Sequence, residues 1–107
     1  MDRAARSRLK KAGWAMGSTA DFLGLSPEES ALIEMRLALS RDLQRRRRLQ
    51  GMTQSQLAKR LHSSQSRVAK MEAADASVSL DLLVRSLLAL GVTRSALART
   101  LGARHAA

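Results

Sequence analysis

Four polar side chains in the middle of the chain are of the types that contact nucleic-acid bases and phosphates. They lie on one side of a predicted helix over residues 65–73 and are Gln65, Ser66, Arg67 and Lys70. Glutamine can bond adenine at two positions, arginine and lysine can donate to guanine acceptors, and serine can contact several bases. No acidic residue interrupts this side before Glu72. Because a solvated helix surface usually mixes both signs of charge, the pattern favours a nucleic-acid contact over a merely solvated surface.

The charge of the chain is concentrated in the same region. The formal net charge is +10, from 19 Lys and Arg against 9 Asp and Glu, which would suit nucleic acid, an acidic partner or an anionic membrane. Residues 36–72 hold ten of the basic groups and only Asp42 and Glu72 as acids, whereas residues 26–35 are acidic. A focused cationic region is what phosphate binding requires. With one Trp, one Phe and no Tyr, base stacking on aromatic side chains is not expected.

Several classes of protein are excluded or disfavoured by the same composition. The absence of cysteine excludes disulfides, thiolate catalysis and cysteine zinc sites. His62 and His105 are far apart and are expected to be surface residues, so no metal and no cofactor is predicted. The Asp residues are scattered and form no catalytic set, so an enzyme is not expected. The apolar stretch 80–90 contains Asp81 and Arg85 and is too short for a membrane span. Together with the missing signal peptide, this predicts a cytoplasmic protein. The expected nucleic-acid contact predicts that the protein is associated with the nucleoid.

The candidate side chains must be positioned by helices, and the sequence predicts five of them and no strand. The first runs from Pro27 to about Gln50, with Ser26 as N-cap and Glu29 completing a capping box. Gly51 ends this helix. Its buried stripe is expected at Leu32, Met35, Leu39 and Leu43.

Two short helices follow, over 53–61 and 65–73. Thr53 and Gln56 form a second capping box, and Ser64 caps the next helix. Their inward residues are expected to be Leu57, Ala58, Leu61, Val68 and Met71. Helices at 80–90, capped by Ser79, and 94–101, capped by Thr93, complete an all-α fold. Two short helices joined by three residues have the dimensions of a helix-turn-helix, here spanning 53–72.

The first 25 residues are predicted to form a separate region. Residues 1–12 are a basic tail without periodicity, and residues 13–25 form an irregular arm that contains Trp14 and Phe22. The predicted division is therefore a tail and arm over 1–25 and a DNA-binding domain over 26–107. The aromatic side chains of the arm either pack on the long helix or bind a partner.

The segments MTQSQLAKRL (52–61) and SQSRVAKME (64–72) resemble the XRE family of lambda-repressor/Cro-like helix-turn-helix regulators. The resemblance implies a five-helix lambda-repressor-like fold over Leu37 to about Leu101. It implies that Gln65, Ser66 and Lys70 read base edges in the major groove and that Arg67 contacts a base or a phosphate. The phosphate contacts that it implies come from Thr53, Gln54 and Ser64.

The resemblance also implies an internal brace, a salt bridge between Arg47 at the end of the long helix and Glu72. Two positions depart from the family pattern, because His62 and Ala74 stand where the family has glycine. Family members usually bind double-stranded DNA as homodimers on a palindromic operator. The dimer contact is expected either from Val92, Leu97 and Leu101 of the last helix, unless these belong to the core, or from the arm.

The flanking segments, 21–29 and 78–83, resemble HigA-like antitoxins of toxin–antitoxin operons. Such proteins repress their own operon and bind a RelE/HigB-like ribonuclease toxin. This resemblance predicts an autorepressor and antitoxin whose N-terminal arm holds the toxin. The alternative is a stand-alone XRE-type repressor without a toxin partner. A nucleoid-type binder is a further alternative, and it would need the positive charge but not the polar side chains on one side of the helix over 65–73.

Overall fold

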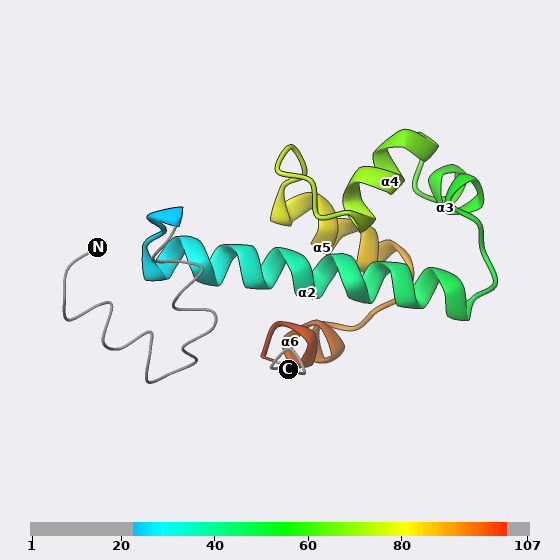
Figure 1. Ribbon diagram of the computed structural model, residues 1–107. Coiled ribbons are helices and arrows are strands. Elements are labelled where there is room, and N and C mark those ends of the chain that lie inside the picture. Colours follow the sequence, from blue (N-terminus) through cyan, green and yellow to red (C-terminus); the bar gives the residue numbers. More distant parts are fainter. Residues whose placement is uncertain (1–22, 103–107) are drawn as a thin grey trace. The chain divides into compact units, whose positions relative to one another are not determined.

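The computed structural model describes residues 23–102, and within this range every regular element is a helix (Figure 1). The helices are α2 (Pro27–Leu49), α3 (Gln54–Arg60), α4 (Gln65–Glu72), α5 (Leu80–Ala89) and α6 (Arg94–Gly102). The predicted all-α fold with five helices is confirmed, and each helix end lies within one residue of its predicted position. The chain divides into two compact units, residues 1–34 and 35–107, and the division falls inside α2.

Helix α2 begins and ends through the local signals that the sequence contains. The Ser26 hydroxyl accepts a hydrogen bond from the Glu29 backbone N–H, and the Glu29 carboxylate accepts one from the Ser26 N–H, both at 3.1 Å. This reciprocal pair is the predicted capping box. At the other end Gly51 has φ +69°, and the Met52 N–H donates to the Arg47 carbonyl at 3.0 Å. The left-handed conformation at Gly51 costs little because glycine has no Cβ.

The core of the unit 35–107 is formed by side chains from all five helices and the loops between them. Leu39 and Leu43 of α2 pack with fully buried residues of α3, α4 and α5, and the cluster is completed by α6 and the segment before it. Its buried members are Leu39, Leu43, Leu57, Ala58, Val68, Met71, Val78, Leu83, Leu87, Leu90, Val92 and Leu97. In Figure 1, α4 lies above α2 and α6 lies below it, so the second half of α2 separates these two helices.

One expectation about apolar residues was wrong, and the structure decides between two alternatives that were open for Val92 and Leu97. Leu32 was predicted to be buried with Leu39 and Leu43, but 48% of it is exposed. The periodicity of apolar residues predicts a stripe along the whole helix, but it does not show how much of that stripe other helices cover. Val92 and Leu97 are only 6% and 7% exposed, so they belong to the core and are not available as a dimer contact. Leu101 remains partly accessible, at 37%.

The two residues that stand where the resembled family has glycine both adopt the left-handed backbone conformation that glycine favours. His62 and Ala74 each have φ +55°. In both cases the following N–H bonds back to the preceding helix, from Ser63 to the Ala58 carbonyl at 2.8 Å and from Asp75 to the Lys70 carbonyl at 3.0 Å. A left-handed conformation costs a residue with a Cβ roughly 1–2 kcal/mol, and the closing hydrogen bonds and core packing on either side offset it. Helix α4 ends at Glu72, and the left-handed residue that follows its C-cap is Ala74 instead of a glycine.

Candidate nucleic-acid interface

Helices α3 and α4 are joined by a short turn whose geometry is fixed at both ends. The Thr53 hydroxyl accepts from the Gln56 N–H at 3.1 Å and the Gln56 side chain accepts from the Thr53 N–H at 2.8 Å, so the predicted capping box is present. The Ser64 hydroxyl caps α4 by accepting from the Arg67 N–H at 3.1 Å. A hydroxyl that accepts a cap bond still has a hydrogen to donate. Thr53 and Ser64 can therefore cap their helices and donate to a phosphate at the same time.

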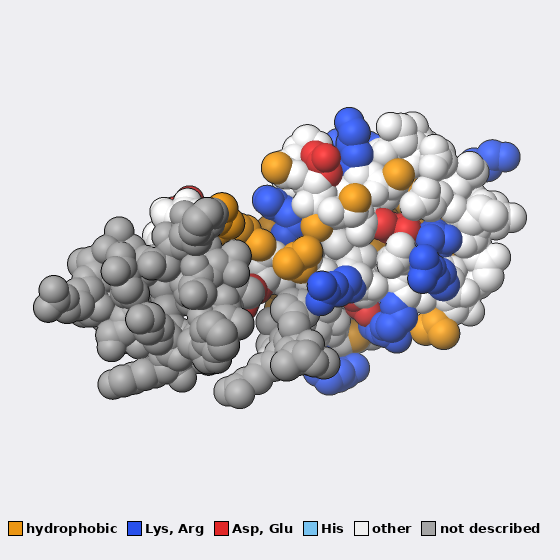
Figure 2. All heavy atoms as spheres, viewed as in Figure 1, with side chains coloured by type: hydrophobic (Ala, Val, Ile, Leu, Met, Phe, Trp, Pro, Cys, Tyr) orange, Lys and Arg blue, Asp and Glu red, His pale blue; other side chains and the backbone are white. Residues whose placement is uncertain are grey.

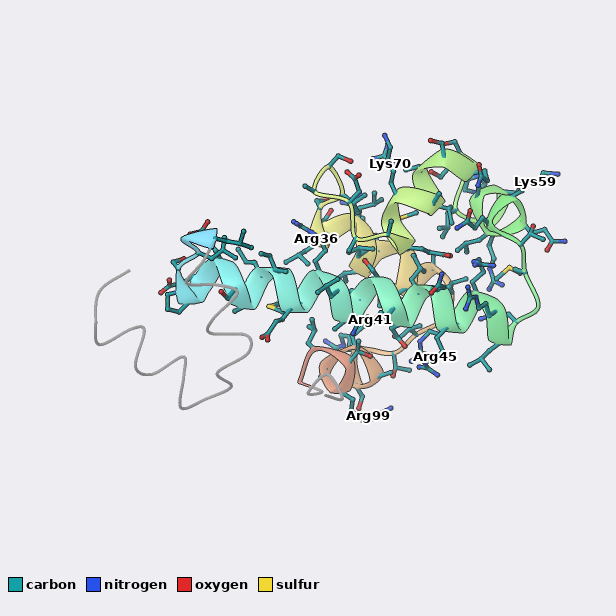
Figure 3. The ribbon with its side chains drawn as sticks, in the orientation of Figure 1. Arg36, Arg41, Arg45, Lys59, Lys70 and Arg99 are labelled. Carbon is teal, nitrogen blue, oxygen red and sulfur yellow. The ribbon has the colours of Figure 1, made fainter. Side chains whose placement is uncertain are left out.

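The exposed side of α4 carries the four predicted base-reading residues together. Val68 and Met71 are completely buried, which turns Gln65, Ser66, Arg67 and Lys70 toward solvent. Lys70 projects away from the domain in Figure 3. Ala69, between the last two, is small and leaves room for a close approach. The arrangement can donate from amide, hydroxyl, guanidinium and ammonium groups over two turns of one helix, which is the size of element that enters a major groove.

One contributor to this surface was not identified in the sequence. Beside α4 lies a hollow of about 350 Å³, lined by Ser64, Ser66, Arg67, Lys70, Ser77, Val78 and Leu82. Ser77 belongs to the loop between α4 and α5 and donates to the Asp75 carboxylate at 2.6 Å. Hydrogen bonds from the Ser77 hydroxyl and N–H lower the pKa of Asp75, so this carboxylate stays charged close to Lys70. Only the loop's folding onto α4 brings Ser77 there, and no local sequence pattern marks it.

Arg47 and Glu72, the two residues of the expected internal brace, are brought together. The Arg47 guanidinium donates through Nε and Nη2 to the two carboxylate oxygens of Glu72, at 2.5 and 2.9 Å. It also donates through Nη1 to the Met52 carbonyl at 2.8 Å. The side chains are 11% and 2% exposed. This two-point contact fixes the end of α2 to the end of α4.

Two glutamines connect the Arg47–Glu72 salt bridge to the exposed side of α4. Gln54 donates to the Glu72 carboxylate at 3.2 Å and accepts from the Gln65 side chain at 2.7 Å. Gln54 was predicted as a phosphate contact only, and this internal role was missed. Its amide nitrogen has a second hydrogen, so a phosphate contact is still chemically available to it. The chain of contacts Arg47–Glu72–Gln54–Gln65 therefore orients a candidate base-reading side chain from the interior.

The protonation state of this network is fixed by its hydrogen bonds. Burial would raise the pKa of Glu72, but hydrogen bonds from Arg47 and Gln54, with the positive charge of Arg47, lower it below its usual value. The hydrogen bond to Glu72 in turn raises the pKa of Arg47, against the effect of burial. Both groups are therefore charged at neutral pH, and the carboxylate can accept the hydrogen bonds from Arg47 and Gln54.

A second ionic cluster was overlooked in the sequence. Asp42 is 6% exposed and accepts from Arg45 at 2.6 Å and from Arg46 at 2.9 Å, and the Thr100 hydroxyl of α6 donates to it at 3.3 Å. The two arginines share one buried acceptor, and 59% of the Arg45 side chain stays exposed. Burial would raise the pKa of Asp42, but the two arginines lower it. The i,i+3 and i,i+4 spacing of these residues is a signal that could have identified the pairs.

The fold and this surface define a class of protein, a helix-turn-helix regulator that binds DNA. Comparison with family models gives one match, described as Helix-turn-helix (HTH_3), over residues 43–97. The match covers just over half of the 107 residues and includes α3, α4 and α5. The chain belongs to this family, the XRE helix-turn-helix family, whose members are DNA-binding regulators of transcription and not enzymes.

Neither the curated proteins nor the solved structures contain a match to the chain. Over residues 23–102 there is no helix long and apolar enough to cross a membrane. The same range contains no group of three or more His, Asp or Glu side chains that could hold a metal ion. His62 is exposed, whereas His105, Trp14 and Phe22 lie outside the described residues.

Proposed function

We propose that the protein is a sequence-specific repressor that binds a palindromic operator in its own promoter as a homodimer. The observation that carries the proposal is the exposed side of α4, where Gln65, Ser66, Arg67 and Lys70 point to solvent and Gln65 is held through Gln54 by a buried salt bridge. A purely electrostatic DNA binder needs positive charge but has no use for an oriented glutamine. The orientation therefore favours base reading over general adhesion to DNA.

The homodimer follows from the small size of the reading surface. One domain presents a single short helix, and specific sites in this class are usually read by two such helices about 34 Å apart. With Val92 and Leu97 in the core, the large apolar residues of the last two helices that are exposed are Leu88, at 45%, and Leu101. These two residues are the candidates for a dimer contact on this side of the domain. The N-terminal arm is the other candidate.

A binding measurement with the protein's own promoter tests the repressor proposal. The full chain is titrated onto a labelled promoter fragment in a gel shift, with an unlabelled scrambled fragment of the same length as competitor. We expect the promoter fragment to bind at least about 10³-fold more tightly than the scrambled one. Equal affinity for the two fragments would contradict specific repression and identify a nucleoid-type binder.

We further propose that the repressor is the antitoxin of a toxin–antitoxin operon and binds a RelE/HigB-like basic toxin. The support comes from residues 23–34, whose charge is opposite to that of the rest of the chain. Glu28 and Glu29 are exposed there, and this segment contains no Lys or Arg. Leu32 and Ile33 follow each Glu by one helical turn and are 48% and 39% exposed. An acidic helix side with exposed aliphatic residues fits a basic protein partner. The segment 1–25, with Trp14 and Phe22, is proposed to bind the same partner.

A pull-down with the adjacent toxin-like gene product tests the antitoxin proposal. The variant Leu32→Asp/Ile33→Asp is expected to capture the basic partner about tenfold less, whereas Leu49→Asp, an exposed leucine at the other end of α2, serves as the control. Deletion of residues 1–25 measures the contribution of the arm. Capture that is undiminished by both changes would contradict this proposal. The alternative of a stand-alone repressor would then remain, since promoter binding is measured independently.

A further inference from the structure

The hollow beside α4 has the size of a small-molecule site. It lies between α4, the loop that follows this helix and the first turn of α5, and its volume is about 350 Å³. Sites for small ligands usually measure about 300–1,000 Å³. Ser66, Arg67 and Lys70 line the hollow and are also candidate base-reading residues, whereas Val78 and Leu82 have no part in the predicted base contacts. The hollow therefore offers contacts that base reading does not use.

The rim of the hollow is cationic and can donate hydrogen bonds. Arg67 and Lys70 are exposed there, and none of the seven lining residues is acidic. The planar guanidinium of an arginine fits the two oxygens of a carboxylate at two points. The Ser64 hydroxyl accepts from the Arg67 N–H at 3.1 Å and still has a hydrogen to donate. The rim can therefore hold the acid group of a ligand.

A carboxylate close to the rim sets the charge of the ligand. Asp75 accepts from the Ser77 N–H at 2.9 Å and from the Ser77 hydroxyl at 2.6 Å, and these bonds, with the charge of Lys70, lower the pKa of Asp75. Figure 3 labels Lys70 at the top of the domain, where Figure 2 shows a blue basic side chain next to a red acidic one. With Arg67, the two positive charges and the one negative charge suit an anion with a single charge.

The floor of the hollow is apolar. Val78 is 3% exposed and belongs to the core, and Leu82 is half-buried and packs against the same core. Covering such a floor with an apolar group is favourable because it removes apolar surface from water. An inorganic anion would use the rim alone. Rim and floor together therefore select a ligand with an acid group at one end and an apolar body at the other.

We propose that the hollow binds a small monocarboxylic acid with an apolar body, and that this effector releases the regulator from its operator. The carboxylate binds Arg67 and Lys70, and the apolar body lies on Val78 and Leu82. Because the acid occupies two of the base-reading side chains, the acid and the operator exclude each other. The inference rests on the proposed operator binding by α4 and adds a means of regulating it.

Binding of the acid is measured first, without DNA, and naphthoate is the probe. Backbone amide NMR signals of the isotope-labelled full chain are followed during a titration, and those of Ser77, Val78 and Leu82 are expected to shift with a dissociation constant of about 1 mM. Naphthalenemethanol lacks the charge and acetate lacks the apolar body, so each is expected to bind at least about tenfold more weakly. Arg67→Gln is expected to weaken naphthoate binding about tenfold, whereas Arg60→Gln, at an exposed position on α3, is the matched control.

Competition with DNA then tests the regulatory part of the proposal. The affinity for the promoter fragment is measured with naphthoate at about ten times its dissociation constant, and it is expected to fall about tenfold. The reference sample contains sodium chloride at the same ionic strength, because DNA binding depends on salt. Naphthalenemethanol at the same concentration is expected to leave the affinity unchanged.

Three outcomes would overturn the proposal. The first is that the amides of Ser77, Val78 and Leu82 do not shift with naphthoate up to about 10 mM. The second is that naphthalenemethanol binds as tightly as naphthoate, and the third is that saturating naphthoate leaves promoter binding unchanged. Failure of the proposed function is distinguishable from these outcomes. Equal affinity for the promoter and the scrambled fragment would contradict the operator, whereas the amide shifts, measured without DNA, still decide whether the hollow binds the acid.

Discussion

Replacing Glu72 by alanine is expected to lower the free energy of unfolding by about 3–5 kcal/mol. The carboxylate is 2% exposed and accepts hydrogen bonds from Arg47 and Gln54. Its removal leaves the Arg47 guanidinium, 11% exposed, without its counter-charge. An unpaired buried charge costs far more than the loss of a surface salt bridge, which is worth about 0–1 kcal/mol. Urea unfolding followed by circular dichroism gives the difference directly.

A double variant separates the cost of the unpaired charge from the value of the pair. Arg47→Met/Glu72→Leu removes both charges and keeps side chains of comparable size, so it is expected to be more stable than Glu72→Ala. A loss below about 1 kcal/mol in Glu72→Ala would mean that the bridge acts as a surface pair, contrary to its burial. Operator binding of Glu72→Ala is expected to fall as well, because Gln54 loses its partner and no longer orients Gln65.

The two buried carboxylates also set the direction of the acid response. Hydrogen bonds and arginines lower the pKa of Glu72 and of Asp42 in the folded state, from usual values of 4.5 and 3.8. Their contribution to stability is therefore complete above about pH 5 and is lost as pH falls through the lowered values. Unfolding midpoints measured from pH 7 down to pH 3 are expected to fall less for Arg47→Met/Glu72→Leu than for wild type.

Local signals in the sequence predicted the fold well. Ser26 with Glu29, Thr53 with Gln56, and Ser64 each satisfy the first N–H groups of a helix, and each cap is formed by the residues that the sequence indicates. Such contacts involve residues three apart, so their geometry depends little on the rest of the molecule. This is why the helix ends were predicted within one residue.

Contacts between helices were harder to predict. The Gln54–Gln65 and Thr100–Asp42 hydrogen bonds join residues 11 and 58 positions apart, and Ser77 reaches the α4 surface through a loop. No periodicity encodes such pairs, because they depend on how the helices pack. Leu32 fails for the same reason, since its exposure depends on what covers the helix and not on the helix itself. The candidate site was therefore predicted as a set of side chains with the Arg47–Glu72 brace, whereas the supporting contacts of Gln54 and Ser77 were not predicted.

Replacing Gln65 or Lys70 by alanine is expected to weaken operator binding by about 1–3 kcal/mol each, roughly 5- to 150-fold. Both side chains are exposed, so neither change is expected to affect folding. Gln65 has no charge, and its loss is expected to leave the affinity for unrelated DNA nearly unchanged. Lys70→Ala also removes a positive charge and lowers the affinity for unrelated DNA to a small extent. Arg85→Ala, which removes an exposed arginine of α5 that pairs with Asp81, is the control for charge.

The most direct measurement is the ratio of affinities for the promoter fragment and for a scrambled fragment, compared between wild type and Gln65→Ala at one salt concentration. Base reading by α4 predicts that the ratio falls at least about fivefold in Gln65→Ala and stays at the wild-type value in Arg85→Ala. An unchanged ratio in Gln65→Ala, with both affinities as in wild type, would contradict the assignment of this helix as the reading element.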